Sequence, residues 1–313
     1  MGVKWLLEGH QVHIVCSSRE SRVACTMLYR MLLQHQPEAF PDQLRFLQYN
    51  FFDVGTDVEK AVNDLSQAAT EDSLYVISDD VELGFQTFCD RLLGRVPGLH
   101  LWAASYFSKH PPDNWPEEYL TRPFRSPPAV VMQVEQDEKF RFNVKPYTQV
   151  ELLQDNNDLE TVYHPPQGHP ALYPGDCETC GCQVATILLR LRESVSERTT
   201  ASGTAQASLE WRDMLVLYGT NLTGIDRKDI SGLINGLKNS GIPVEIMKDD
   251  NIKDVATACT DVVWVTNTRN VRGLERKVVV VVQESNFDIH NDRLYLMSRC
   301  SSKLVIVCPD KRL

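Results

Sequence analysis

The sequence lacks any apolar run long enough to cross a membrane as a helix. No stretch approaches the ~20 apolar residues that a bilayer span needs, and the valine run Val278 to Val282 has the length of a strand. The first eight residues also lack the long apolar core and the small-residue cleavage site of a secretory signal peptide. We therefore expect no association with a membrane.

The sequence also lacks an excess of positive charge. Its 32 lysine and arginine residues face 42 aspartate and glutamate residues, which gives a net charge of −10. Nonspecific nucleic-acid binders usually carry a basic face, so the composition does not support a broad nucleic-acid surface, although a local basic groove is compatible with it. The nine cysteines are an odd number scattered through apolar segments. This favours reduced thiols over a disulfide framework and predicts a cytoplasmic or nuclear protein.

Short apolar strands alternate with helical patterns over most of the chain. The length of 313 residues and the hydrophobic content of 42% allow two domains with buried cores. Continuous apolar strands are typical of parallel sheets covered on both faces, and the alternation implies right-handed βαβ units. The predicted strands are Val12 to Val15, Phe46 to Phe52, Leu74 to Ile77, Leu99 to Ala103, Val130 to Val134, Met214 to Leu217, Ile242 to Ile246, Val262 to Val265, Val278 to Val282 and Leu304 to Val307.

The middle of the chain has a weaker pattern. Residues 136–170 are polar and contain prolines, and they predict no regular element. Residues 183–192 predict a short helix, and the Ser/Thr/Ala-rich segment Ser194 to Ser208 predicts a flexible loop.

Two acidic residues, Asp79 and Asp80, follow the predicted strand Leu74 to Ile77 after one serine. Ligands gather at the carboxyl edge of parallel sheets. In P-loop NTPases a strand delivers an acidic residue there to the magnesium ion beside the nucleotide phosphates. Paired acids after an apolar strand also occur by chance in loops, so the pair by itself is compatible with both interpretations.

Three further motifs give the acidic pair a context. Gly273-Leu274-Glu275 precedes the strand Val278 to Val282, Ser298-Arg299-Cys300 precedes the last strand, and Phe124-Arg125-Ser126 lies between the two strand-rich regions. The order of these motifs along the chain and their spacing resemble those of superfamily 1 helicases. Phe124-Arg125-Ser126 resembles the fourth motif of that family, Gly273-Leu274-Glu275 the fifth and Ser298-Arg299-Cys300 the sixth. The sequence is most similar to the helicase-like domains of the Schlafen type. Asp79-Asp80 then stands where the second motif of that family has Asp-Glu.

The resemblance implies an α/β protein with two RecA-like domains and mainly parallel sheets. Residues 1–117 would form the first domain, and residues 118–313 the second domain with an insertion at about 135–210. ATP and magnesium are the implied ligands, and DNA or RNA is the implied partner.

The resemblance also assigns roles to single residues. Asp79 would hold the magnesium ion, and Asp80 would replace the water-positioning glutamate with a side chain one methylene shorter. Gly273 and Glu275 would lie at the nucleotide, where Glu275 would contact the ribose or couple ATP to nucleic acid.

Two arginines, Arg125 and Arg299, would reach the γ-phosphate from the second domain. A guanidinium suits this task because it stays charged and binds phosphate oxygens in a bidentate way. Such arginines can contribute ~10³-fold or more to phosphoryl transfer. The alternative for Arg299 is a cation at the end of a helix, where the helix dipole favours it.

The chain departs from the family at the phosphate-binding loop. It contains no Gly-x-x-x-x-Gly-Lys-Ser/Thr motif, whose backbone amides and lysine bind the phosphates, and Leu101 to Ser105 lacks the glutamine of the third motif. We therefore expect an N-terminally truncated first domain, either as a fragment, which the start inside a helix favours, or as a degenerate NTPase. Two functions stay open: a helicase-like ATP-binding and ATP-hydrolysing fragment that is weak alone, or a non-catalytic interaction and regulatory module, a pseudoenzyme.

A separate candidate site is the run Cys177-Glu178-Thr179-Cys180-Gly181, preceded by His164 and His169. A Cys-x-x-Cys-Gly turn is typical of half a zinc knuckle, and His164, His169, Cys177 and Cys180 would complete four ligands. A redox pair is an alternative, but it lacks the expected preceding strand. The third interpretation is that the cysteines merely begin a helix.

Overall fold

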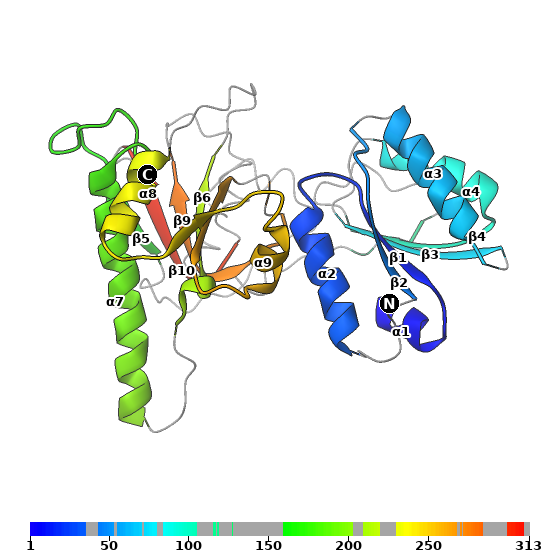
Figure 1. Ribbon diagram of the computed structural model, residues 1–313, viewed down its shortest axis with the longest axis horizontal. Coiled ribbons are helices and arrows are strands. Elements are labelled where there is room, and N and C mark those ends of the chain that lie inside the picture. The colour runs from blue at the N-terminus through cyan, green and yellow to red at the C-terminus, as the bar shows by residue number, and fades with distance from the viewer. Residues whose placement is uncertain are drawn as a thin grey trace. The chain divides into compact units, whose positions relative to one another are not determined.

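The computed structural model describes residues 1–35, 43–52, 55–70, 72–79, 84–104, 115–116, 118, 127, 159–202, 209–219, 230–267, 270, 272–283 and 299–309. The chain divides into two compact units (Figure 1). The first unit is Met1–Glu118 together with Asn270–Gly273, and the second is Tyr119–Arg269 together with Leu274–Leu313. No helix among the described residues is long and apolar enough to span a membrane. The predicted strand Val130 to Val134 lies outside the described residues.

The first unit contains a four-stranded sheet in the order β2-β1-β3-β4, and all its pairings are parallel. Helices α1 and α2 pack on one face and helices α3 and α4 on the other (Figure 1). The elements are α1 (Gly2–Leu7), β1 (Val12–Cys16), α2 (Arg22–His35), β2 (Leu44–Gln48), α3 (Thr56–Ala68), β3 (Ser73–Asp79), α4 (Phe85–Arg95) and β4 (Gly98–Ala103).

The second unit contains a six-stranded parallel sheet in the order β5-β10-β9-β6-β8-β7. Its elements are β5 (Leu159–Tyr163), α7 (Glu178–Ser202), the 3₁₀ helix η2 (Trp211–Asp213), β6 (Met214–Tyr218), α8 (Ser231–Asn239), β7 (Val244–Ile246), α9 (Ile252–Thr257), β8 (Val263–Asn267), β9 (Arg276–Val282) and β10 (Cys300–Cys308). The predicted α/β fold with two parallel sheets is therefore confirmed.

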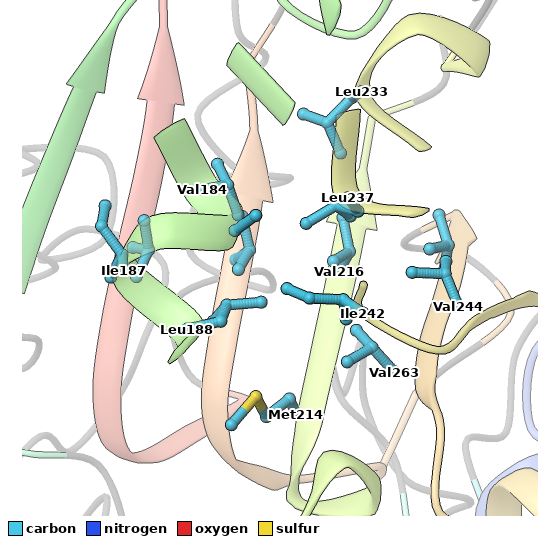
Figure 2. Close-up of a cluster of buried hydrophobic side chains, with 14 of the residues drawn as sticks. Val184, Ile187, Leu188, Met214, Val216, Leu233, Leu237, Ile242, Val244 and Val263 are labelled. Atoms are coloured by element: carbon cyan, nitrogen blue, oxygen red, sulfur yellow. The ribbon is translucent and has the colours of Figure 1, made fainter. Parts of the chain in front are cut away.

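Helices α7 and α8 cover one face of the second sheet. Figure 2 shows side chains of both helices meeting the strand residues Met214, Val216 and Val263 in one buried cluster. The valines of β9 from Val278 to Val282 are at most 2% exposed. Each fully buried valine contributes roughly 1.5 kcal/mol or more, so β9 is a major source of stability for this unit.

Two predictions for the middle of the chain are wrong. The segment Leu159–Tyr163 is a strand, because it pairs with β10 at the edge of the described sheet, where a half-buried polar sequence suffices. Helix α7 extends from Glu178 to Ser202, well beyond the predicted helix 183–192 and through the start of the predicted loop. No proline or glycine interrupts residues 183–202, and serine and threonine reduce helix stability only slightly.

His13 is a buried polar group in the middle of β1. Its side chain is 1% exposed, and neither ring nitrogen has a hydrogen-bond partner among the described residues. Burial, with a smaller contribution from the positive charge of Arg45, lowers the pKa of His13 from 6.5 to about 4. The folded first unit therefore holds this imidazole in its neutral form.

We predict that His13 destabilises the first unit in acid. The unfolded chain takes up this proton as the pH falls through 6.5, whereas the folded chain does so only near 4, so stability is lost between these values. Relative to neutral pH the loss is about 2–3 kcal/mol at about pH 4.5. Urea unfolding of the wild type and of His13→Leu at both pH values should show a smaller pH dependence in the variant. Equal pH dependence in the two proteins would show that the imidazole is solvated.

Candidate metal centre

Four potential metal ligands converge inside the second unit. The side chains of His164, His169, Cys177 and Cys180 are all buried, and their ligand atoms lie within 4.8 Å of one another. The two cysteines are not joined by a disulfide bond. These are the four residues that the sequence singled out as candidate zinc ligands, and the structure brings them together.

Three segments position the four ligands. His164 directly follows β5, and its backbone N–H donates to the carbonyl of Cys308 at the end of β10. His169 follows Gly168, whose φ of +83° lies in the left-handed region that favours glycine. Cys177 and Cys180 lie at the beginning of α7, one helical turn apart. The end of β5 and the beginning of α7 thus position the loop between them, which has little regular structure.

The distances are close to those of a tetrahedral site. Nδ1 of His164 lies 3.3 Å from Sγ of Cys180, and Nδ1 of His169 lies 3.2 Å and 3.3 Å from Sγ of Cys177 and Cys180. A tetrahedral zinc ion with bonds of about 2.3 Å to sulfur and about 2.0 Å to nitrogen separates such ligands by about 3.5 Å. The cluster therefore needs only small shifts to accept a cation at its centre.

A backbone carbonyl orients the ring of His164. Its Nε2 lies 3.0 Å from the carbonyl oxygen of Ala171, which can only accept a hydrogen bond, so Nε2 carries the proton. The lone pair is then on Nδ1, the atom that faces Cys180. Metal-bound histidines almost always donate their other N–H in this way. Sequence reasoning missed Ala171, because a backbone contact leaves no signature in the choice of side chain.

Burial shifts the pKa of two residues of the cluster. Desolvation, with Cys177 as the next cause, raises the pKa of the Cys180 thiol well above its usual range. Desolvation is also the largest cause that lowers the pKa of His169. A neutral imidazole is ready to bind a metal, and a cation would supply the positive charge that two buried thiolates need.

The cluster adjoins an open surface depression between β5 and α7. His169 lines this depression together with Tyr163, Gln183 and Arg190. A buried metal site needs an entry path, and the depression brings one of the four ligands close to the surface.

The residues implied by the helicase resemblance are distributed over both units. Asp79 ends β3 in the first unit, level with Cys16 of β1. Gly273 also belongs to the first unit and has a φ of +77°. A Cβ added to Gly273 would lie 2.6 Å from Cβ of Ala24 and 3.9 Å from Oδ2 of Asp79. The structure thus brings two of the predicted nucleotide-site residues together at the carboxyl edge of β3.

Other predicted nucleotide-site residues lie elsewhere. Glu275 and Arg299 belong to the second unit and precede β9 and β10, where the backbone N–H of Arg276 donates to the carbonyl of Arg299. Asp80 and Arg125 lie outside the described residues. A meeting of these arginines with Asp79 across a cleft stays a prediction.

Comparison with known proteins gives structural likenesses alone. No protein-family model and no curated protein matches the chain. Its structure is similar to that of the DEAD-box helicase Mss116 bound to ssRNA and UDP-BeF, with 10% sequence identity and a TM-score of 0.43. It is also similar to Mss116p bound to ssRNA and AMP-PNP, with 9% identity and a TM-score of 0.41. A DEAD box protein from the hyperthermophile Methanococcus jannaschii is 11% identical, with a TM-score of 0.33.

These likenesses extend over nearly the whole chain. They cover 96%, 96% and 97% of it, but only 59% of each Mss116 chain and 75% of the archaeal chain. The chain thus spans less than two thirds of the length of the Mss116 structures.

Proposed function

We propose that the second unit binds one zinc ion through His164, His169, Cys177 and Cys180, and that this ion is structural. The observation that carries the proposal is the convergence of four buried N and S ligands from three segments within 4.8 Å. Two thiolates with two imidazoles are the ligand set of tetrahedral zinc sites. Four protein ligands also leave no open position for a reacting water, which distinguishes a structural site from a catalytic one.

The same observations favour zinc over the redox alternative for Cys177 and Cys180. A redox-active cysteine needs an accessible thiol with a lowered pKa. Both thiols are 0% exposed, and burial raises the pKa of Cys180. The interpretation that the cysteines merely begin a helix leaves the two histidines at 3.2–3.3 Å from the sulfurs without a reason.

We predict that Cys180→Ser abolishes stoichiometric zinc binding, whereas Cys182→Ser keeps it. Cys182 is the matched control because it lies two residues further along α7 and is exposed. Loss of one ligand leaves the other three ligands buried without the ion. The unfolding temperature of the second unit should therefore fall by on the order of 10 °C. Elemental analysis of the proteins after gel filtration, which removes unbound metal, gives the zinc content, and calorimetry gives the unfolding temperature. If the wild-type protein is as stable without zinc as with zinc, the site is refuted.

We further propose that the chain is a helicase-like nucleotide-binding protein that acts on or near DNA or RNA. The ordered motifs at Asp79, Arg125, Gly273-Leu274-Glu275 and Arg299 support this, as does the position of Gly273 beside Asp79 at a sheet edge. Asp79 would hold magnesium, with Asp80 as the water-positioning acid. The similar Mss116 structures contain ssRNA with UDP-BeF or AMP-PNP. The alternative is a non-catalytic, helicase-like interaction and regulatory module.

The two alternatives differ in whether the chain binds ATP. Because the chain has no Gly-x-x-x-x-Gly-Lys-Ser/Thr loop, we predict weak ATP binding that depends on magnesium and decreases at least about fivefold in Asp79→Asn and in Arg299→Ala. Titration with a fluorescent ATP analogue measures it, with Asp90→Asn, an exposed acid on α4, as the control. No binding at all would favour the interaction module. Tight binding with rapid magnesium-dependent hydrolysis would contradict the expected weakness.

A further inference from the structure

Helix α8 begins on the backbone of the metal-binding loop. The backbone N–H of Leu233, one of the first amides of the helix, donates to the carbonyl oxygen of Gly175 at 2.9 Å. The first amides of a helix have no partner inside the helix and need one from outside. The N-cap residue of α8, Ile230, makes no side-chain capping hydrogen bond. The carbonyl two residues before Cys177 therefore takes over part of the capping of this helix.

Two glycines of α8 allow its backbone to touch the segment that carries both cysteine ligands. A Cβ added to Gly232 would lie 2.2 Å from the carbonyl of Asp176 and 2.7 Å from the amide nitrogen of Cys177. A Cβ added to Gly236 would lie 2.3 Å from the carbonyl oxygen of Glu178. These neighbours are backbone atoms and cannot turn away as a flexible side chain could. The helix thus fits the loop only while residues 176–178 keep this path.

Helix α7 contributes a third glycine to the same contact. A Cβ added to Gly181 would lie 2.3 Å from the carbonyl oxygen of Leu233 and 2.9 Å from Cα of Gly236. The side-chain amide of Asn239 also donates to Glu178 at 2.7 Å. The beginning of α7, where Cys177 and Cys180 lie, is therefore in backbone contact with α8 from Gly232 to Gly236.

We propose that zinc binding and the docking of α8 are coupled, so that loss of zinc releases α8 from α7 while the sheet stays folded. This proposal rests on the proposed zinc site. The ion fixes the path of the loop from His164 to Cys180, and that path is the surface on which α8 lies. The coupling is reciprocal: zinc favours the docking of α8 by a certain factor, and the docking of α8 favours zinc binding by that same factor. A change that disturbs α8 should therefore weaken zinc binding.

The size of α8 makes a local release physically reasonable. It spans nine residues, and isolated helices shorter than about 12–15 residues are marginal in water. Its buried side chains Leu233 and Leu237 pack into the core shared with α7 (Figure 2). The strands of the sheet, by contrast, are held by their own parallel ladder. Local opening of a single element is common in proteins, because different cooperative units open at different free energies.

Hydrogen exchange of the full chain with and without zinc tests the coupling directly. After chelation, with zinc loss verified by elemental analysis, amides of Ser231–Asn239 should exchange at least about tenfold faster, while Val263–Asn267 in β8 keep their rates. Unchanged exchange in α8 would overturn the proposal, and so would a joint loss of protection in α8 and β8. A wild-type chain that never holds zinc would refute the zinc site itself, and the coupling with it.

A second variant tests the reciprocal effect. Gly236→Ala should weaken zinc binding roughly tenfold in competition with a coloured chelator, although residue 236 is not a ligand. Asn235→Ala is the matched control, because Asn235 is exposed and adjacent in the same helix, and its affinity should stay unchanged. Equal zinc affinity of folded Gly236→Ala and the wild type would overturn the coupling. Should Gly236→Ala fail to fold, the exchange experiment on the wild type decides.

Discussion

Two thiols and two imidazoles lie together in the interior of the second unit, in an arrangement that can hold a cation. Their ligand atoms are within 4.8 Å of one another and all four residues are buried. Neutral thiols are weak hydrogen-bond partners for imidazole nitrogens, and buried thiolates without a counter-charge are costly. The single divalent ion that we propose would satisfy all four groups at once.

The proposed metal centre and the apolar sheet would stabilise different parts of the unit. The valines of β9 and their neighbours in β6 and β10 are buried and hydrogen-bonded in a regular ladder. The loop between β5 and α7 has neither advantage, since residues 164–177 form no helix or strand. In our proposal zinc organises this segment, on which helix α8 lies through Gly232 and Gly236.

The parallel sheets were largely predictable because their strands are continuous apolar runs. β1, β3, β4, β6, β7, β8, β9 and β10 all coincide with predicted strands, and β2 starts and ends a few residues earlier than predicted. β5 was missed because Leu159–Tyr163 is mixed in polarity and depends on β10 for its pairing. The full length of α7 was missed because its Ser/Thr-rich end resembles a loop in composition although nothing in it stops a helix.

The ligands were also predictable, but their surroundings were not. The spacing of Cys177 and Cys180 is typical of zinc ligands and can be recognised in a single sequence. The carbonyl of Ala171 and the glycines of α8 act through backbone atoms and across long sequence separations, so only a structure reveals them. The predicted meeting of Asp79 and Arg299 is of the same long-range kind, and it stays a prediction.

X-ray absorption at the zinc edge of the purified wild-type protein would show whether the four side chains bind zinc together. We expect a four-coordinate ion with two sulfur ligands at about 2.3 Å and two nitrogen ligands at about 2.0–2.1 Å. A first shell made only of oxygen and nitrogen, or one with four sulfurs, would contradict a centre built from His164, His169, Cys177 and Cys180.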